Sequence, residues 1–232
     1  MSLTKVSKSN HLVESSYKLS LKEQRLILVC LSKIDPRGPV PKEISVTASE
    51  YSRLMHVANK NAYRELFKAA SDIYNRSIVV CNREKKEEFR WVQKKTTCQK
   101  GEGKVTLVWS DEVLKYISQL SSRFTSYHLH NVAKLGTPYA IRLYELLIQF
   151  QTTKERTIKL DDFRSYLQLK NKYQLFKDLS KRVIKPALEE INKKSNLNAF
   201  YSPVKSGRRV TSLYFEFKEK EVFVPSKDER KA

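Results

Sequence analysis

The stretch that decides the fold runs from Asn171 to Thr211 and reads NKYQLFKDLSKRVIKPALEEINKKSNLNAFYSPVKSGRRVT. In it Lys177, Lys181 and Lys185 recur at every fourth position, and this spacing places side chains on one face of a helix. The apolar residues of the same stretch fall on the opposite face, namely Phe176, Leu179, Val183, Ala187, Leu188 and Ile191. The spacing therefore predicts a helix over about 173–194 with one apolar face and one lysine face.

Two strand-like runs follow this helix, at Ala199–Val204 and Val210–Phe217, and a basic turn joins them. A helix followed by a basic-tipped hairpin is how a winged helix meets duplex DNA. The helix can enter a major groove, while the hairpin tip reaches the neighbouring backbone or minor groove. Pro186 lies inside the helix and is expected to kink it or break it locally. The candidate DNA-binding residues are Lys177, Lys181, Arg182 and Lys185 for the groove and Lys205, Arg208 and Arg209 for the wing.

The charge balance points to a polyanionic partner. The chain has 232 residues, with 45 Lys and Arg against 25 Asp and Glu, which gives a net charge of +20. The alternative is a generally solubilising surface, but solvated helix faces usually mix the two signs. Here the lysines come first along the helix, where they oppose the helix dipole, and phosphates would supply the missing negative charge.

Other features of the sequence narrow the class. There is no run of about 18 apolar residues, and Met1–Asn10 lacks a signal-peptide apolar region, so no membrane span or export is expected. Cys30, Cys81 and Cys98 are scattered without zinc spacing; the first two are predicted to be buried thiols. A bacterial cytoplasm, with no metal and no cofactor, is the simplest expectation.

The same order of elements occurs twice. The predicted elements of the first half are a helix capped by Ser20 and Glu23 and ending near Ile34, a strand at Glu43–Val46, helices at Thr47–Met55 and Asn59–Tyr74, strands at Ser77–Cys81, Glu88–Thr96 and Lys104–Trp109, and a helix at Ser110–Leu120. Those of the second half, before the stretch quoted above, are a helix from Thr137-Pro138 to Phe150, a strand at Thr157–Leu160, and a short helix capped by Asp161 and ending near Leu167.

This repetition predicts an α+β fold of two tandem winged-helix domains. We expect an N-terminal domain over residues 1–120, a connector over 121–136 with a strand-like run at Phe124–Leu129, a C-terminal domain over 137–224, and a disordered tail over 225–232. The first domain carries a weaker basic stripe of Lys60, Arg64 and Lys68, which Glu65 and Asp72 dilute, and a basic turn near Lys94, Lys95 and Lys100. A solvated face is the alternative for this stripe.

Three stretches together resemble one family: Tyr17–Leu26, then Phe124–Tyr127 with Tyr139–Leu146, then Val183–Asn192. The chain resembles the iteron-binding plasmid replication initiators, the initiator Rep proteins with two winged-helix domains. The resemblance implies binding to direct repeats of an origin as a monomer, and repression of its own promoter as a dimer in equilibrium with the monomer. It further implies that the second domain is the main reader, that the first adds backbone contacts and the dimer interface, and that host proteins, an initiator ATPase and the replicative helicase, open the origin.

Two alternatives remain open. His128-Leu129-His130 lies on a strand-like run, where alternate residues share a face, so both imidazoles could bind one metal. With Tyr173 or Tyr139 as nucleophile, this would suit a rolling-circle nicking initiator, although a third ligand is missing nearby. The other alternative is a winged-helix transcriptional repressor only. No nucleotide-binding loop or hydrolase motif is present, so an enzyme is not expected.

Overall fold

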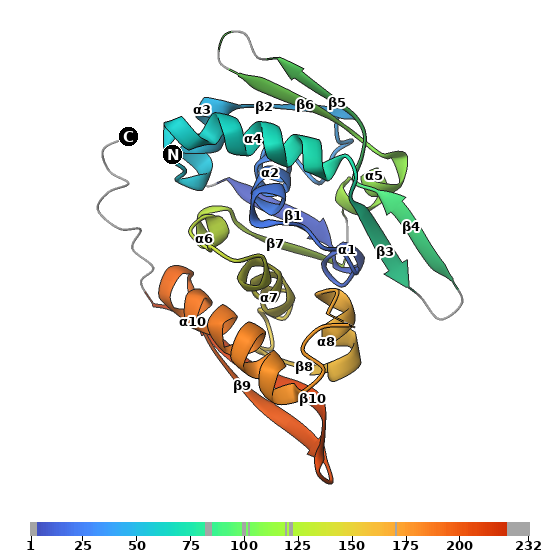
Figure 1. Cartoon of the computed structure of the whole chain (residues 1–232), viewed down its shortest axis with the longest axis vertical. Helices are drawn as coiled ribbons and strands as arrows, with labels where there is room; N and C mark the ends of the chain where they lie inside the picture. Colours follow the sequence, from blue (N-terminus) through green and yellow to red (C-terminus); the bar gives the residue numbers. More distant parts are fainter. Residues whose placement is uncertain are drawn as a thin grey trace.

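The computed structural model describes residues 4–81, 85–98, 101, 103–118, 120, 123–169 and 171–221. Two α+β halves follow one another along the long axis of the molecule (Figure 1). The N-terminal half occupies the upper part of the view, and the long helix and hairpin of the C-terminal half form the lower end.

The C-terminal half is a winged helix. Its helices and strands are α7 (Pro138–Ile148), β8 (Glu155–Lys159), α8 (Leu160–Tyr166), a long helix made of α9 (Phe176–Leu179), the π-helical η1 (Ser180–Ile184) and α10 (Lys185–Lys194), and the hairpin β9 (Leu197–Ser206) and β10 (Arg209–Glu219). The strands form one antiparallel sheet in the order β8-β10-β9. One sheet face packs against the helices, because Leu213, Phe215 and Phe217 on β10 are all buried.

The N-terminal half repeats this topology with one insertion. Its elements are α2 (Leu21–Ser32), β2 (Glu43–Thr47), α3 (Ala48–Met55), α4 (Asn59–Ile73), β3 (Ser77–Cys81), β4 (Lys86–Arg90), β5 (Val92–Cys98), β6 (Lys104–Trp109) and α5 (Asp111–Ile117). Its sheet has the order β2-β6-β5, which corresponds strand for strand to β8-β10-β9. The hairpin β3–β4 is inserted between α4 and this sheet. The predicted pair of winged-helix domains is confirmed.

A small sheet lies between the two halves. Strand β1 (Lys5–Ser9), which continues into the short helix α1 (Asn10–Val13), pairs antiparallel with β7 (Phe124–His128), and helix α6 (His130–Ala133) follows. The strand-like run expected in the connector is therefore β7. The boundaries expected between domain, connector and domain stay a prediction. Helix α7 contacts α10 of the C-terminal half, and Gln24 of α2 donates to the carbonyl of Pro138 at the start of α7, so this helix is bonded to both halves.

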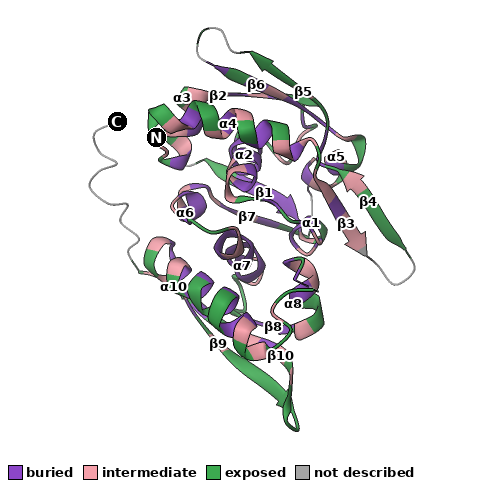
Figure 2. Ribbon diagram, in the orientation of Figure 1, coloured by how far each residue is buried: buried purple, intermediate pink, exposed green. Residues whose placement is uncertain are grey.

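Helix α7 is the centre of the molecule (Figure 2), since every residue from Ala140 to Ile148 is buried. A helix that is buried all round belongs to a core that extends on both sides of it. Thr137 caps it by accepting a hydrogen bond from the backbone N–H of Ala140, and Pro138 occupies its first turn, as predicted. Two of its buried residues, Arg142 and Glu145, are charged.

Three of the differences between the predicted elements and the structure have a visible cause. The long helix begins at Phe176 and not near Tyr173, whose φ of 53° is left-handed and cannot belong to the helix. The single strand predicted over 88–96 is divided at the buried Trp91, whose N–H donates to the carbonyl of Arg76. Asp161 lies in the first turn of α8 and does not cap it, because Lys159 occupies the cap position.

Some predictions fall outside the described residues. These are the side chains of Cys81 and Lys100 and the tail over 225–232. Cys30 is buried, as predicted, and burial raises the pKa of its thiol to about 12. Within the described ranges, no helix is long and apolar enough to cross a membrane.

Candidate nucleic-acid interface

The long helix of the C-terminal half separates its charged face from its apolar face as the sequence predicts. Lys177, Lys181, Arg182 and Lys185 are all exposed, while Leu179, Val183, Ile184, Ala187, Leu188 and Ile191 are buried. None of the four cations pairs with a carboxylate among the described residues. Their charge is therefore directed to solvent and is available to an external anion.

A π-helical turn in the middle of this helix accommodates Pro186. The N–H of Lys185 donates to the carbonyl of Ser180, five residues back, and Pro186 then falls in the first turn of α10. A proline is tolerated there because it lacks only a donor that the first turn does not use. The local break expected at Pro186 is therefore a widened turn that covers Ser180–Ile184, immediately before the proline.

The wing is a tight hairpin with a cationic tip. Ser206 pairs with Arg209, so the loop contains only Gly207 and Arg208, and Gly207 has the φ of 59° that such a turn requires. A hollow of about 820 Å³ separates this tip from the start of the long helix. Its lining includes Lys205, Arg208 and Arg209 from the wing and Leu175 and Phe176 from the helix start. The structure thus brings the predicted wing cations together with the start of the predicted groove helix.

Arg164 on α8 fixes the loop that leads into this helix. Its guanidinium donates to three consecutive carbonyls, those of Lys172 at 3.0 Å, Tyr173 at 2.8 Å and Gln174 at 3.1 Å. Arg164 is only 9% exposed and also lines the hollow. Sequence reasoning missed it, because a single arginine on a short helix gives no signal of burial.

The cations of the basic stripe in the N-terminal half have more partners within the protein than the sequence indicates. Lys60, Arg64 and Lys68 are exposed on α4, but Lys68 pairs with Asp72 at 3.2 Å and Arg64 donates to the side chain of Asn61. Glu65 does not neutralise the stripe, since it faces Lys22 and Arg25 of α2 at 3.8 Å. The stripe therefore offers a weaker positive surface than the long helix of the C-terminal half.

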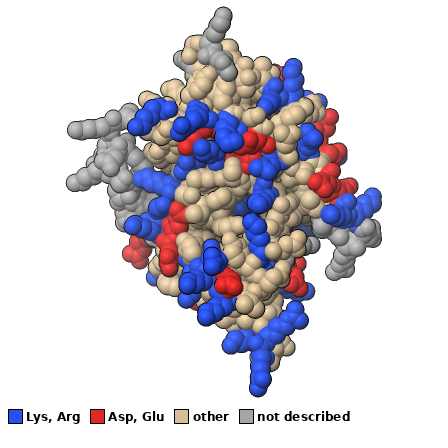
Figure 3. Space-filling model, in the orientation of Figure 1, with Lys and Arg blue, Asp and Glu red and all other residues tan. Residues whose placement is uncertain are grey.

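Both basic surfaces are visible from one side of the molecule. In Figure 3 Lys and Arg side chains gather over α4 in the upper part and over α10 and the wing tip in the lower part. Acidic side chains lie between and beside them, so the surface is not uniformly positive. Cations over α4 and over α10 with the wing therefore lie on the same face of the molecule.

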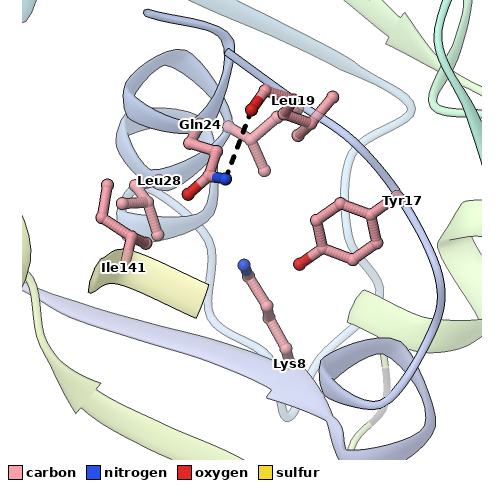
Figure 4. Close-up of a pocket in the computed structure, with 7 residues that line it drawn as sticks. Lys8, Tyr17, Leu19, Gln24, Leu28 and Ile141 are labelled. Carbon is pink, nitrogen blue, oxygen red and sulfur yellow. Dashed lines mark hydrogen bonds between the residues drawn. The ribbon is translucent and has the colours of Figure 1, made fainter. Parts of the chain in front are cut away.

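A buried ionic cluster connects the two halves. Glu145 of α7 is completely buried and receives the Lys8 ammonium at 2.5 Å, the Tyr127 hydroxyl at 2.6 Å and the Arg142 guanidinium at 3.1 Å. Burial alone would raise the pKa of Glu145, but Lys8 and Arg142 outweigh it and hold the pKa below its usual value. Lys8 also projects, with Tyr17 and Gln24, into a cavity of about 10 Å³ (Figure 4).

The N-terminal segment reinforces this connection. Arg142 donates to the backbone carbonyls of Val13 and Ser15, and its guanidinium lies 3.9 Å from the centre of the Tyr17 ring. Ser16 pairs through its backbone with Val79 of β3, and its hydroxyl donates to the carbonyl of Ser165 at the end of α8. The segment therefore bonds to β3 of the N-terminal half and to α7 and α8 of the C-terminal half.

The two histidines lie close together but not as the sequence predicts. β7 ends at His128 and His130 begins α6, so they are not alternate residues of one strand. Their rings stack with centroids 5.5 Å apart. Burial, with Lys5 nearby, lowers the pKa of His128. Within the described part of the chain, no group of three His, Cys, Asp or Glu side chains could hold a metal ion.

Two winged helices, each with exposed cations on one helix, define a tandem winged-helix protein. Residues 5–148 match the family model described as Initiator Replication protein, WH1, and residues 159–217 match the model described as Initiator Rep protein, WH2. The chain therefore belongs to the initiator replication protein family, which confirms the resemblance seen in the sequence.

Individual relatives agree with this assignment. A replication initiation protein of Escherichia coli is 34% identical over an alignment of 227 residues, with 93% of this chain and 70% of the relative covered. The PI protein of Escherichia coli is 24% identical over an alignment of 251 residues, with 92% of this chain and 82% of the relative covered. The crystal structure of Pi initiator protein in complex with iteron DNA has a TM-score of 0.82 at 21% identity, and covers 96% of this chain and 100% of that one. This similarity shows that the two proteins share a fold.

Proposed function

We propose that this protein initiates plasmid replication by binding the direct repeats of an origin as duplex DNA. The observation that carries the proposal is the unpaired cationic face of the long helix, which adjoins the hollow that the wing cations line. Family membership supports the role in initiation, and the fold is shared with a Pi initiator that was crystallised with iteron DNA.

In this proposal the two halves have different tasks. The helix that carries Lys177, Lys181, Arg182 and Lys185 enters a major groove, and the wing that carries Lys205, Arg208 and Arg209 contacts the adjacent backbone or minor groove. The α4 stripe of Lys60, Arg64 and Lys68 adds weaker phosphate contacts. They are weaker because two of its three cations are already engaged within the protein. Phosphate contacts position the protein on the duplex, and contacts to base edges supply its specificity.

The finer parts of the proposal concern partners. The chain exists as a monomer on origin repeats and as a homodimer, with the N-terminal half as interface, on an inverted repeat of its own promoter, which it represses. A host initiator ATPase and the replicative helicase complete origin opening in the cytoplasm, and this chain contributes binding without a catalytic step. Sedimentation of the protein on each DNA would test this assignment: one protomer per direct repeat and two per inverted repeat are expected, and equal stoichiometry on both would contradict it.

An origin-establishment assay tests the initiator role against that of a repressor only. A plasmid that carries only the origin repeats is introduced into cells that supply this chain in trans. Establishment is expected with the natural chain and not with a variant in which Lys177, Lys181 and Lys185 are all alanine. Failure of the natural chain on a cognate origin that it binds in vitro would leave only the repressor function.

The second candidate function is a nicking initiator, because the rings of His128 and His130 lie stacked beside each other. Supercoiled origin plasmid is incubated with the protein and Mg²⁺ or Mn²⁺. We expect the plasmid to remain supercoiled. Relaxed circles with covalently attached protein, lost in His128→Ala, would replace the binding proposal with the nicking one.

A further inference from the structure

Leu175, at the start of the long helix, is a large apolar side chain that is exposed to solvent. It precedes the first residue of the long helix and is 69% exposed, more than any other large hydrophobic residue in the described part of the chain. Single apolar residues on a surface are common and need no explanation. Leu175 differs because it lines the hollow between the helix start and the wing cations Lys205, Arg208 and Arg209.

The backbone that carries Leu175 is held rigidly. The three hydrogen bonds from Arg164 fix the carbonyls of residues 172–174, and Tyr173 is held there in a left-handed conformation with φ of 53°. Phe176, which follows Leu175, also lines the hollow and is partly buried against the core. Leu175 is therefore presented in a preset position, so little conformational entropy is lost when it makes a contact.

The charge around Leu175 identifies what covers it. The hollow is lined by the wing cations Lys205, Arg208 and Arg209, and by one carboxylate, Asp161. Lys177 adds a further exposed cation two residues along the helix. Because cations exceed the single carboxylate, the occupant is a polyanion with an apolar group at its surface. Duplex DNA meets both requirements, because the 5-methyl group of thymine is an apolar group in the major groove. Leucine offers no hydrogen bond, and so it can select a base only through that methyl group.

We propose that Leu175 reads one thymine of the recognised repeat by packing against its 5-methyl group, with Arg164 as the positioning residue. This inference rests on the proposed function, since it assumes that the long helix enters the major groove. It adds a specificity-determining contact that carries no charge, beside the cationic contacts that the sequence predicts.

The test replaces each thymine of the repeat in turn by deoxyuridine, which lacks only the methyl group, and measures affinity by fluorescence anisotropy at fixed salt. At one position the natural protein is expected to bind about fourfold more weakly, as the burial of one methyl group predicts. Leu175→Ala should bind the thymine repeat more weakly and show no change at that position. Phe200→Ala is the matched control, because Phe200 is 61% exposed on β9 but does not line the hollow.

Several results would overturn the inference. One is equal affinity of the natural protein for all the deoxyuridine duplexes; another is a deoxyuridine effect that persists undiminished in Leu175→Ala. Arg164→Lys keeps the charge but cannot reach three carbonyls, so it should keep its salt dependence and lose the deoxyuridine response; a retained response would refute the positioning role. If instead the natural protein fails to prefer the repeat to a scrambled duplex, the proposed function itself has failed.

Discussion

Replacement of Glu145 by glutamine tests the ionic cluster that connects the two halves. The amide keeps the shape of the side chain but removes the charge that pairs with Lys8 at 2.5 Å and Arg142 at 3.1 Å. Both cations are nearly completely buried, with side chains 5% and 3% exposed. Removing one partner of such a buried pair leaves uncompensated charge and costs about 3–5 kcal/mol.

Denaturant and thermal unfolding measure this cost. For a chain of this size each kcal/mol corresponds to about 2–4 °C in Tm, so a decrease of about 6–20 °C is expected at pH 7. Glu50→Gln is the matched control, because the Lys33–Glu50 pair has a similar distance of 2.8 Å but lies at the surface. It should cost at most about 1 kcal/mol.

The pH dependence of the difference in unfolding free energy between the natural protein and Glu145→Gln tests whether the charge of Glu145 causes that difference. The pKa of Glu145 in the folded protein lies below its usual value, so its stabilising contribution is complete above the unfolded pKa of about 4.3 and is lost as the pH falls through the folded pKa. The gap in unfolding free energy between the natural protein and Glu145→Gln should therefore narrow below about pH 4.3. A gap under about 1 kcal/mol at pH 7, or one that stays constant down to pH 3, would refute the reasoning.

The other predictions concern the reading surface and the wing turns. Lys177→Ala and Lys181→Ala should each either reduce the salt slope of DNA binding by about one unit, for a phosphate contact, or cost about 1–3 kcal/mol on the cognate repeat, for a base contact; unchanged binding by anisotropy in both would contradict the groove assignment. Gly103→Ala should lower the unfolding free energy more than Gly207→Ala. Both glycines have positive φ, a conformation that costs any other residue about 1–2 kcal/mol. The new Cβ at Gly103 would in addition lie 2.6 Å from the Tyr63 ring, whereas the new Cβ at Gly207 meets no atom. Equal destabilisation of the two in urea would show that the Tyr63 contact carries no cost. Glu190→Ala should cost about 1–3 kcal/mol, because its carboxylate accepts from Gly136 N–H and Thr137 Oγ1 and joins α10 to the cap of α7; a loss as small as that of Glu189→Ala, at an exposed neighbour, would contradict this.

Much of the fold could be predicted from local signals. The strands Ser77–Cys81 and Lys104–Trp109 agree residue for residue, and α4 differs from its predicted end by one residue. Helix α4 carries a clear apolar periodicity, since Ala62, Leu66, Ala69, Ala70 and Ile73 are its buried residues. The sequence also predicts that Lys177, Lys181 and Lys185 lie opposite the buried face of the long helix. All three are exposed in the structure, although a π-helical turn interrupts the regular spacing.

What could not be predicted depends on contacts between distant parts of the chain. Strand β1 was missed because its sequence is polar and its partner β7 lies more than 100 residues away. The predicted helix start at Tyr173 was wrong because the carbonyl of Tyr173 accepts a hydrogen bond from Arg164 and its φ is left-handed. The cluster around Glu145 joins residues from three separate segments, and no spacing rule in the sequence connects them.

We expect the cationic face of the long helix to read a specific duplex. Fluorescence anisotropy of the purified protein tests this with a labelled duplex of about one 20-bp direct repeat from the plasmid's own origin, beside a scrambled duplex, over a salt series. Binding at physiological salt should be about 10³-fold or more tighter on the repeat. Equal affinity for both duplexes, lost together as salt rises, would contradict it and would mean that the charge serves only non-specific association.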